Sequence, residues 1–294
     1  MIEPALLGLL LSTFRLATPL ALAALGELVA ERAGVLNIGI EGMMLAGAFA
    51  AFTLGGVSGS AAWGALAGGL AGVSMAALFA VFVLQRRADP IVCGAAINVL
   101  ALGATGTLHR ILLPPTAALP AVPRAAELLP GLNVFVALTA VLALAVALAL
   151  ARTRIGLELR AVGERAKAAH AQGVAVLRLR WGATLFGGAC AGLAGASLVL
   201  WISSTFVEGL TSGRGFIALA LVLFGGFRAG RILLGALLFG AASALQFHLQ
   251  ALGLEIPYSL LLMTPYLLTL LVLAVFAERV RPPADLARPF WGRE

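Results

Sequence analysis

The sequence predicts an all-α membrane protein, a polytopic helical bundle of about nine passes. The chain has 294 residues, of which 61% are hydrophobic and only 11% are charged. Soluble domains carry about a quarter charged residues, whereas the mean hydropathy here is +1.04. Several apolar runs are also long enough to cross the hydrocarbon of a bilayer, which takes roughly 20 helical residues. We therefore expect one transmembrane domain over residues 1–294.

The expected spans follow from these apolar runs. Three runs, 132–151, 181–202 and 257–277, contain no charged residue. The other candidates are 4–26 with Arg15 inside it, 42–60, 61–84, 91–108 and 232–251. Residues 215–227 are apolar but too short to cross alone, since a helix of that length rises only about 20 Å. Counted with the loop before it, this segment gives the ninth pass.

Basic residues orient the predicted spans. Segment 152–180 carries seven Lys or Arg residues against two glutamates. An excess of Lys and Arg marks cytoplasmic loops, so this segment is expected inside. Counting spans outward from it places the N-terminus outside and the C-terminus in the cytoplasm.

Small residues recur at four-residue spacing in two of the expected spans. Gly64, Gly68 and Gly72 fall on one helix face, and so do Gly188 and Gly192. Such faces let membrane helices approach closely. They predict a tightly packed bundle but identify no function.

The segment ERAGVLNIGIEGMM, residues 31–44, places Glu31, Arg32 and Glu41 between apolar runs. One Arg or Asp at the centre of a lipid-facing helix costs about 2.5–3.5 kcal/mol on insertion scales. The segment must therefore lie outside the hydrocarbon or line a cavity in the protein. Two interpretations stay open. One is a short polar loop before a helix with Glu41 in its favourable first turn; the other is a broken helix beside a solute pathway.

A second break resembles the first. The segment FVEGLTSGRGFIALALVLFGG, residues 206–226, has Glu208 and Arg214 ahead of the short apolar helix. By the span count the two breaks have opposite orientation, so we expect broken or half-helices in an inverted repeat that relates 16–110 to 181–277.

Polar groups inside membrane bundles usually face a cavity or one another. The candidate substrate contacts are therefore the polar residues in or beside the breaks: Asn37, Glu41, Asn98, Glu208 and Arg214. For Asn98, a hydrogen bond between helices is the simpler explanation.

Five blocks in order along the chain resemble permease subunits of bacterial ABC importers of nucleosides and simple sugars, in the family that includes ribose and branched-chain amino acid permeases. The blocks are 26–48, 89–106, 156–176, 211–227 and 264–277. Within that group the chain is similar to the shorter of two permeases that occur together in nucleoside importers. The resemblance implies a separate ABC ATPase, a second permease in a heterodimer, and an extracytoplasmic solute-binding protein or lipoprotein.

Under this resemblance, residues 156–180 match the cytoplasmic loop that contacts the ATPase, within the coupling loop 152–180. The stretch GERAKAAHAQG, residues 163–173, is interpreted as a short coupling helix that Gly173 ends. Its expected contact residues are Gly163, Glu164, Ala168, Ala169 and Gly173, with Ala166 and Ala171 beside them in a groove of the partner. From the pattern alone, a solvated basic loop is an equal alternative.

The sequence also lacks several catalytic motifs. The single lysine, Lys167, lies in RAKAA, so no G-x-x-x-x-G-K-[ST] phosphate loop exists. No His/Cys metal cluster and no G-x-S-x-G occurs. We expect no catalytic residue, metal or cofactor, with ATP hydrolysis on another subunit. The net charge of +7 sits at the ends of apolar runs, so the expected surroundings are membrane lipid and nucleic acid is not an expected partner.

The sequence thus predicts a permease subunit of an ATP-driven importer in the bacterial inner membrane, which moves a nucleoside or related small polar solute inward. A sugar or vitamin stays open as substrate. One alternative is an ion-coupled secondary transporter with Glu27, Glu31, Glu41 or Glu208 as a carboxylate relay. Another is a structural subunit without a substrate path.

Overall fold

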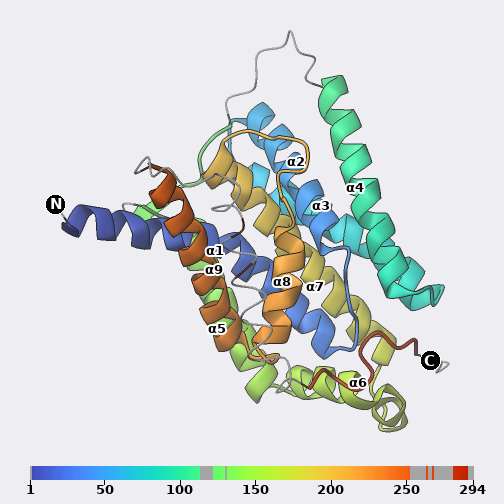
Figure 1. Ribbon diagram of the computed structural model, residues 1–294. Helices are drawn as coiled ribbons and strands as arrows, with labels where there is room; N and C mark the ends of the chain where they lie inside the picture. The colour runs from blue at the N-terminus through green and yellow to red at the C-terminus, as the bar shows by residue number, and fades with distance from the viewer. Residues whose placement is uncertain are drawn as a thin grey trace.

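The transmembrane bundle is seen in a computed structural model, which describes residues 2–112, 122–129, 131–251, 263, 267 and 281–290. Helices dominate it (Figure 1). In the first half they are α1 (Ile2–Arg32), α2 (Ile40–Ser58), α3 (Ala61–Ala80) continued by the π-helical η1 (Val81–Gln85), and α4 (Pro90–Leu112). A short antiparallel pair follows, β1 (Glu127–Leu129) with β2 (Leu132–Asn133). The second half has α5 (Val134–Arg152), α6 (Arg154–Ala171), α7 (Val176–Ser197) continued by the π-helical η2 (Leu198–Ser203), α8 (Arg214–Phe224) and α9 (Ala229–Ala251).

Seven helices in the described part of the chain are long and apolar enough to cross a membrane: α1, α2, α3 with η1, α4, α5, α7 with η2, and α9. The prediction of an all-α polytopic membrane bundle is therefore confirmed. The count of nine passes stays a prediction. The eighth apolar helix, α8, is short, and the expected span 257–277 lies outside the described residues apart from 263 and 267.

The predicted end of the first span, at residue 26, is wrong. Helix α1 continues to Arg32 and includes both Glu27 and Glu31. These two side chains are 0% and 4% exposed. Because they face the interior of the bundle, the insertion cost that suggested an earlier end does not apply to them. Arg15, which also lies in α1, donates to the carbonyls of Trp201 and Ile202 in η2.

The predicted small-residue faces bring α3 and α7 into backbone contact. A Cβ added at Gly72 would overlap the carbonyl oxygen of Gly188, and one added at Gly192 would overlap that of Gly68. Helix α2 joins the same layer, since a Cβ at Gly47 would strike the backbone of Gly192. The absence of side chains at these positions is what allows three helices to pack this closely.

The order of packing agrees with the expected inverted repeat. Helix α7 packs on α3, and α1 packs on α9, where a Cβ at Gly240 would lie 2.8 Å from the Ala17 Cβ. Helices α1 and α7 cross each other at Gly26 and Gly187. A break follows each of the two, ahead of α2 and α8 respectively. The repeat itself stays a prediction.

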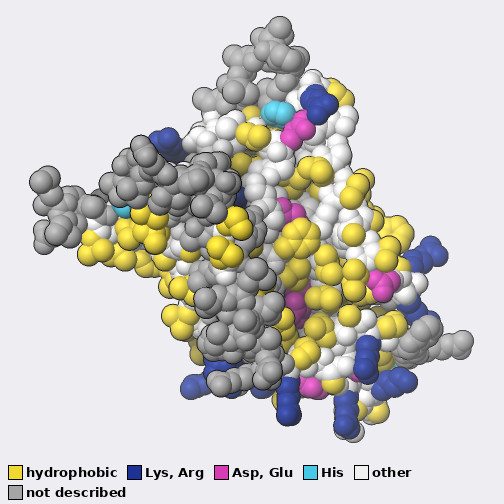
Figure 2. Space-filling view, in the orientation of Figure 1, with side chains coloured by type: hydrophobic (Ala, Val, Ile, Leu, Met, Phe, Trp, Pro, Cys, Tyr) yellow, Lys and Arg dark blue, Asp and Glu magenta, His cyan; other side chains and the backbone are white. Residues whose placement is uncertain are grey.

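The two ends of the bundle differ in charge. Lys and Arg side chains gather along the lower edge in Figure 2, where Figure 1 shows α6 and segment 281–290. Above this edge, hydrophobic side chains spread over the described surface in this view, with fewer Lys and Arg side chains among them. We call the end that holds α6 the basic end, and the end where α4 finishes at Leu112 the opposite end.

We predict that Gly68→Leu prevents assembly of the bundle. A Cβ at Gly68 would lie 2.7 Å from the Ala196 Cβ and 2.9 Å from the Gly47 carbonyl oxygen. Overpacking typically lowers the stability of the folded state by about 1–3 kcal/mol. Here the new side chain meets the backbone of α2, which cannot move aside as a side chain can. The yield of monodisperse protein on size-exclusion chromatography in detergent measures this effect.

The neighbouring Gly69→Leu is the matched control, since a Cβ at Gly69 meets nothing closer than 3.5 Å. It should give the wild-type yield. Equal yields of the two variants would contradict the packing described for α3 and α7.

Candidate functional site

Helices α2 and α8 begin side by side, and the carboxylate of Glu41 joins their ends. Its Oε1 accepts hydrogen bonds from the Thr211 hydroxyl at 2.6 Å and from the Gly213 N–H at 2.7 Å. Its Oε2 accepts from the Gly215 N–H at 2.7 Å. The first N–H groups of a helix have no partner within the helix, and a negative charge there is favourable. Glu41 thus caps α8 while it stands in the first turn of α2.

Gly215 is what allows this close approach. A Cβ at this position would lie 2.6 Å from the backbone of Glu41 and 2.8 Å from its Oε2. The two breaks identified in the sequence therefore meet at one junction, which we call the Glu41 junction, formed by Glu41, Thr211, Gly213 and Gly215.

The turn between α1 and α2, residues 33–39, is held by side chains. The backbone N–H of Asn37 donates to Glu27 Oε1 over 2.9 Å, and Asn37 Oδ1 accepts from the Gly39 N–H at 3.1 Å. The Asn37 amide also donates to the Met43 sulfur at 3.3 Å. Asn37 is 0% exposed, so these bonds satisfy polar groups of a side chain that solvent does not reach.

Asn98 connects α4 to the same turn. Its Oδ1 accepts from the Gly42 N–H at 2.8 Å, and its Nδ2 donates to the Ile38 carbonyl at 3.0 Å. Both ends of the amide are bound to backbone, as the simpler explanation of a hydrogen bond between elements expects. Asn37, Glu41 and Asn98 therefore lie together around the start of α2.

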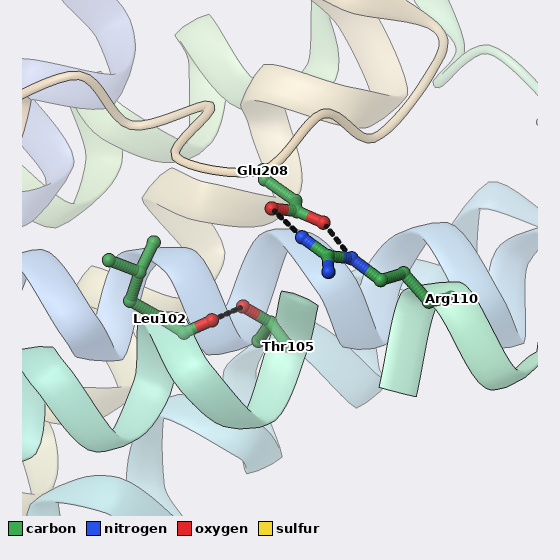
Figure 3. Close-up of polar contacts among 4 residues, drawn as sticks. All are labelled: Leu102, Thr105, Arg110 and Glu208. Carbon is green, nitrogen blue, oxygen red and sulfur yellow. Dashed lines mark hydrogen bonds and ion pairs between the residues drawn. The ribbon is translucent and has the colours of Figure 1, made fainter. Parts of the chain in front are cut away.

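Glu208 lies apart from that group, at the opposite end. Figure 3 shows its carboxylate paired with Arg110 of α4, with N–O distances of 2.9 and 3.1 Å. The close-up also shows Thr105 bonded to the Leu102 carbonyl within α4. The hydrogen bond from Arg110 lowers the pKa of the Glu208 carboxyl below its ordinary value. Both partners are exposed, so screening by water leaves the pair weak.

Arg214 stays close to the Glu41 junction as the first residue of α8. Its Nη1 donates to the carbonyls of Leu210 and Thr211 at 3.0 and 3.2 Å. The guanidinium thus stabilises the loop that presents Thr211 and Gly213 to Glu41.

Three further buried charged residues, Glu27, Glu31 and Arg180, were not among the candidate contacts. Glu27, whose Oε1 holds Asn37, has its other oxygen, Oε2, buried without a hydrogen-bond partner among the described residues. Glu31 lies one helical turn further along the same face of α1. Their four-residue spacing is the signal that could have shown a shared inward face.

Arg180 is the third omission. It lies in the first turns of α7, which begins at Val176, so the last residues of the predicted loop 152–180 are helical; the cytoplasmic position of the loop stays a prediction. The Arg180 side chain is 2% exposed and donates to the carbonyl oxygens of Ala33 at 3.1 Å and Arg288 at 2.9 Å. It therefore satisfies a carbonyl just past the end of α1, where intrahelical partners are missing.

The predicted coupling helix is longer than expected and bent. Helix α6 runs from Arg154 to Ala171 with a kink at Arg165, where φ is −151° and ψ is 85°. Gly173, with φ +82°, follows its last turn as predicted. Glu164 and Ala168 are exposed.

Two of the four alanines expected in a groove of the partner, Ala166 and Ala169, are covered by the chain itself. Gly163 packs so closely on α1 that a Cβ would overlap the Arg32 carbonyl oxygen. Ala166 and Ala169 are buried in a cluster with Phe290. Glu164, Ala168, Ala171 and Gly173 stay free to face a partner.

Comparisons with known proteins place these features in context. A family model described as the permease component of the branched-chain amino acid transport system matches residues 9–275. The chain is 37% identical to the guanosine ABC transporter permease protein NupQ of Bacillus subtilis, over 95% of both chains. It is 34% identical to the nucleoside ABC transporter permease protein NupC of Lactococcus lactis, over 91% of this chain and 92% of NupC.

A further relative comes from Haloferax volcanii and is named "Putative glucose ABC transporter permease protein TsgC13". It is 38% identical over 85% of this chain and 80% of its own. No solved structure matches the chain.

We predict that Glu41→Gln destabilises the protein. An amide in place of the carboxylate turns an N–H group toward one of the N–H donors of α8 and leaves it unsatisfied, which costs about 1–3 kcal/mol. Thermal unfolding in detergent should show a lower melting temperature. Glu158→Gln is the control, because Glu158 makes a partly exposed pair with Arg154 within α6, worth about 0.3–0.5 kcal/mol. Melting at the same temperature for both variants would argue against the Glu41 junction.

Proposed function

The chain belongs to the permease family named for branched-chain amino acid transport systems, and from this membership we propose that it is the permease subunit of an ATP-driven importer. Such a permease is a multi-pass membrane protein that transports a solute. It is not an enzyme itself. The observation that carries the proposal is the family match over residues 9–275, which includes both helix breaks and α6. An ion-coupled secondary transporter is not favoured, because the family works with an ATPase.

The proposed substrate is a nucleoside or a related small polar solute. The support is the similarity to NupQ and NupC, whose names state guanosine and nucleoside transport. The similarity to the Haloferax protein, which is named for glucose, makes a sugar the alternative to be tested.

The proposed ATPase contact is the exposed part of α6 and the turn after it. Glu164, Ala168 and Gly173 face away from the bundle there, and a helix with small residues on its free face fits into a groove of a partner. This assignment puts the basic end in the cytoplasm, in agreement with the excess of arginine, and the N-terminus on the outside.

A second permease is proposed to complete the membrane part. Bacillus subtilis has two guanosine ABC transporter permease proteins, NupQ and NupP, and this chain resembles both. By this analogy we propose a heterodimer, with an extracytoplasmic solute-binding protein or lipoprotein at the opposite end.

The proposed solute route passes the Glu41 junction. Glu41 and Arg214 are only half-buried, and charged groups at this depth in a membrane protein usually mark a solute pathway. Closure of the ATPases on ATP would move α6 and rock the helices against one another along the α3–α7 face. The Glu41 junction would then be exposed first to one side of the membrane and afterwards to the other.

We predict that Ala168→Trp abolishes copurification with the ATPase subunit proposed above. A bulky side chain on the free face of α6 blocks docking but touches no packed residue. Val57→Trp, at a position 86% exposed near the end of α2, is the control and should retain the ATPase. Retention by both variants would place the docking surface elsewhere.

We predict that the complex in proteoliposomes takes up radiolabelled guanosine only when ATP is present. Uptake should persist after an ionophore collapses the ion gradients. Radiolabelled glucose is measured in parallel. ATP-dependent uptake of glucose alone would support the proposal of an ATP-driven importer but identify a sugar as its substrate. Uptake driven by a proton gradient without ATP would refute the importer.

A further inference from the structure

The C-terminal segment 281–290 lies across the basic end and is bonded to α6 on both sides of its kink. The Asp285 N–H donates to the Gly163 carbonyl over 2.8 Å. The Asp285 Oδ2 accepts from the Ala166 N–H, also at 2.8 Å. The helical geometry fails at Arg165 between these two residues, so the next N–H takes its acceptor from outside the helix.

The same segment is bonded to the turn between α1 and α2. The Ala287 N–H donates to the Gly34 carbonyl over 3.1 Å. Next to this bond, the buried Arg180 guanidinium holds the carbonyls of Ala33 and Arg288 together. Arg180 therefore ties α7, the turn 33–39 and the C-terminal segment at one point.

An aromatic anchor ends the segment. Phe290 is 6% exposed, and its ring meets the His170 ring edge-on with 5.4 Å between centroids. Its apolar neighbours come from both halves of α6 and from α7: Val162, Ala166, Ala169 and Val176. The segment is thus fixed at both of its contacts with α6.

The turn 33–39 also connects to the candidate site. Asn37 binds Glu27, and the turn ends where α2 begins with Glu41. Contiguous hydrogen bonds therefore run from α6, through residues 285–288, to the turn that positions the start of α2.

We propose that segment 281–290 is a strap that transmits movement of α6 to the turn 33–39, with Asp285 and Arg180 as its positioning residues. The proposal rests on the proposed function, because it assumes that an ATPase moves α6. A second route exists, since Gly163 of α6 packs directly on the Arg32 carbonyl. That contact is van der Waals packing, which transmits movement of α6 only toward α1. The hydrogen bonds of the strap also transmit movement of α6 away from the turn 33–39.

The test uses the complex with its ATPase and second permease, reconstituted in nanodiscs. Hydrogen–deuterium exchange is compared between the nucleotide-free state and the state trapped with ATP and vanadate. In the wild type, trapping should change exchange both at 163–171 and at 33–39. In Asp285→Ala the change at 163–171 should persist, while the change at 33–39 falls by about fivefold, a size found along coupling networks. The rate of ATP hydrolysis should stay near the wild-type value.

Two further variants sharpen the result. Asp285→Asn keeps an oxygen that can accept from the Ala166 N–H and should restore the response. Arg288→Ala is the control, because its side chain is 72% exposed and only pairs at 3.7 Å with Asp285 Oδ1, a contact that water screens. The variant leaves the Asp285 carboxylate and the carbonyl that Arg180 binds.

The outcomes separate the two proposals. A wild-type response at both segments that Asp285→Ala leaves intact would overturn the strap, while the importer would stand. Faster exchange over the whole chain in Asp285→Ala would show that Asp285 only supports folding, which also overturns the strap. A wild-type chain that binds no ATPase would refute the proposed function, and the strap with it.

Discussion

Backbone groups at a helix break inside a membrane find no water to bind, and this constraint governs the centre of the molecule. The Glu41 carboxylate supplies the missing acceptor, because it accepts hydrogen bonds from Thr211, Gly213 and Gly215 at the start of α8. The N–H groups of Gly213 and Gly215 stand at the start of α8 without a partner in the helix, and this one side chain satisfies both. The charge of Glu41 is in turn tolerated because three donors surround it. The start of α8 and the charge of Glu41 therefore stabilise each other.

Close helix packing supports this junction from outside. The backbone contacts of α2 and α3 with α7 leave no room for side chains at Gly47, Gly72 and Gly192. In lipid there is little hydrophobic force between helices, so such contacts supply the van der Waals attraction that holds a bundle together. They also fix the position of α2, whose Glu41 contacts the start of α8.

Much of this architecture could be predicted from local patterns. The glycine spacing, the two breaks and the favourable place of Glu41 in a first helical turn depend on neighbours in sequence, and the structure agrees with all three. The end of α1 could not be placed, since the cost of Glu27 and Glu31 depends on whether they face lipid or protein. Glu208 was grouped with Arg214 because they are close in sequence, yet it pairs with Arg110 at the opposite end.

The basic end illustrates the same limit. Counting charges treats Arg180 as a solvated residue of a loop, but segment 281–290 covers it from the other end of the chain. The burial of Ala166 and Ala169 has the same cause. No pattern within 152–180 carries that information, because the covering residues lie more than a hundred positions away, as the Ala166–Asp285 bond spans 119.

The contact of Arg15 with η2 has a consequence for tolerance of acid. Arg15 binds backbone carbonyls of Trp201 and Ile202, which carry no titrating proton. The ion pair of Arg110 with Glu208 at the same end loses its negative partner once acidity overcomes the lowered pKa of Glu208. Strong acid would therefore remove the charge attraction between α4 and the loop before α8, whereas the attachment of α1 to η2 has no acidic partner to lose.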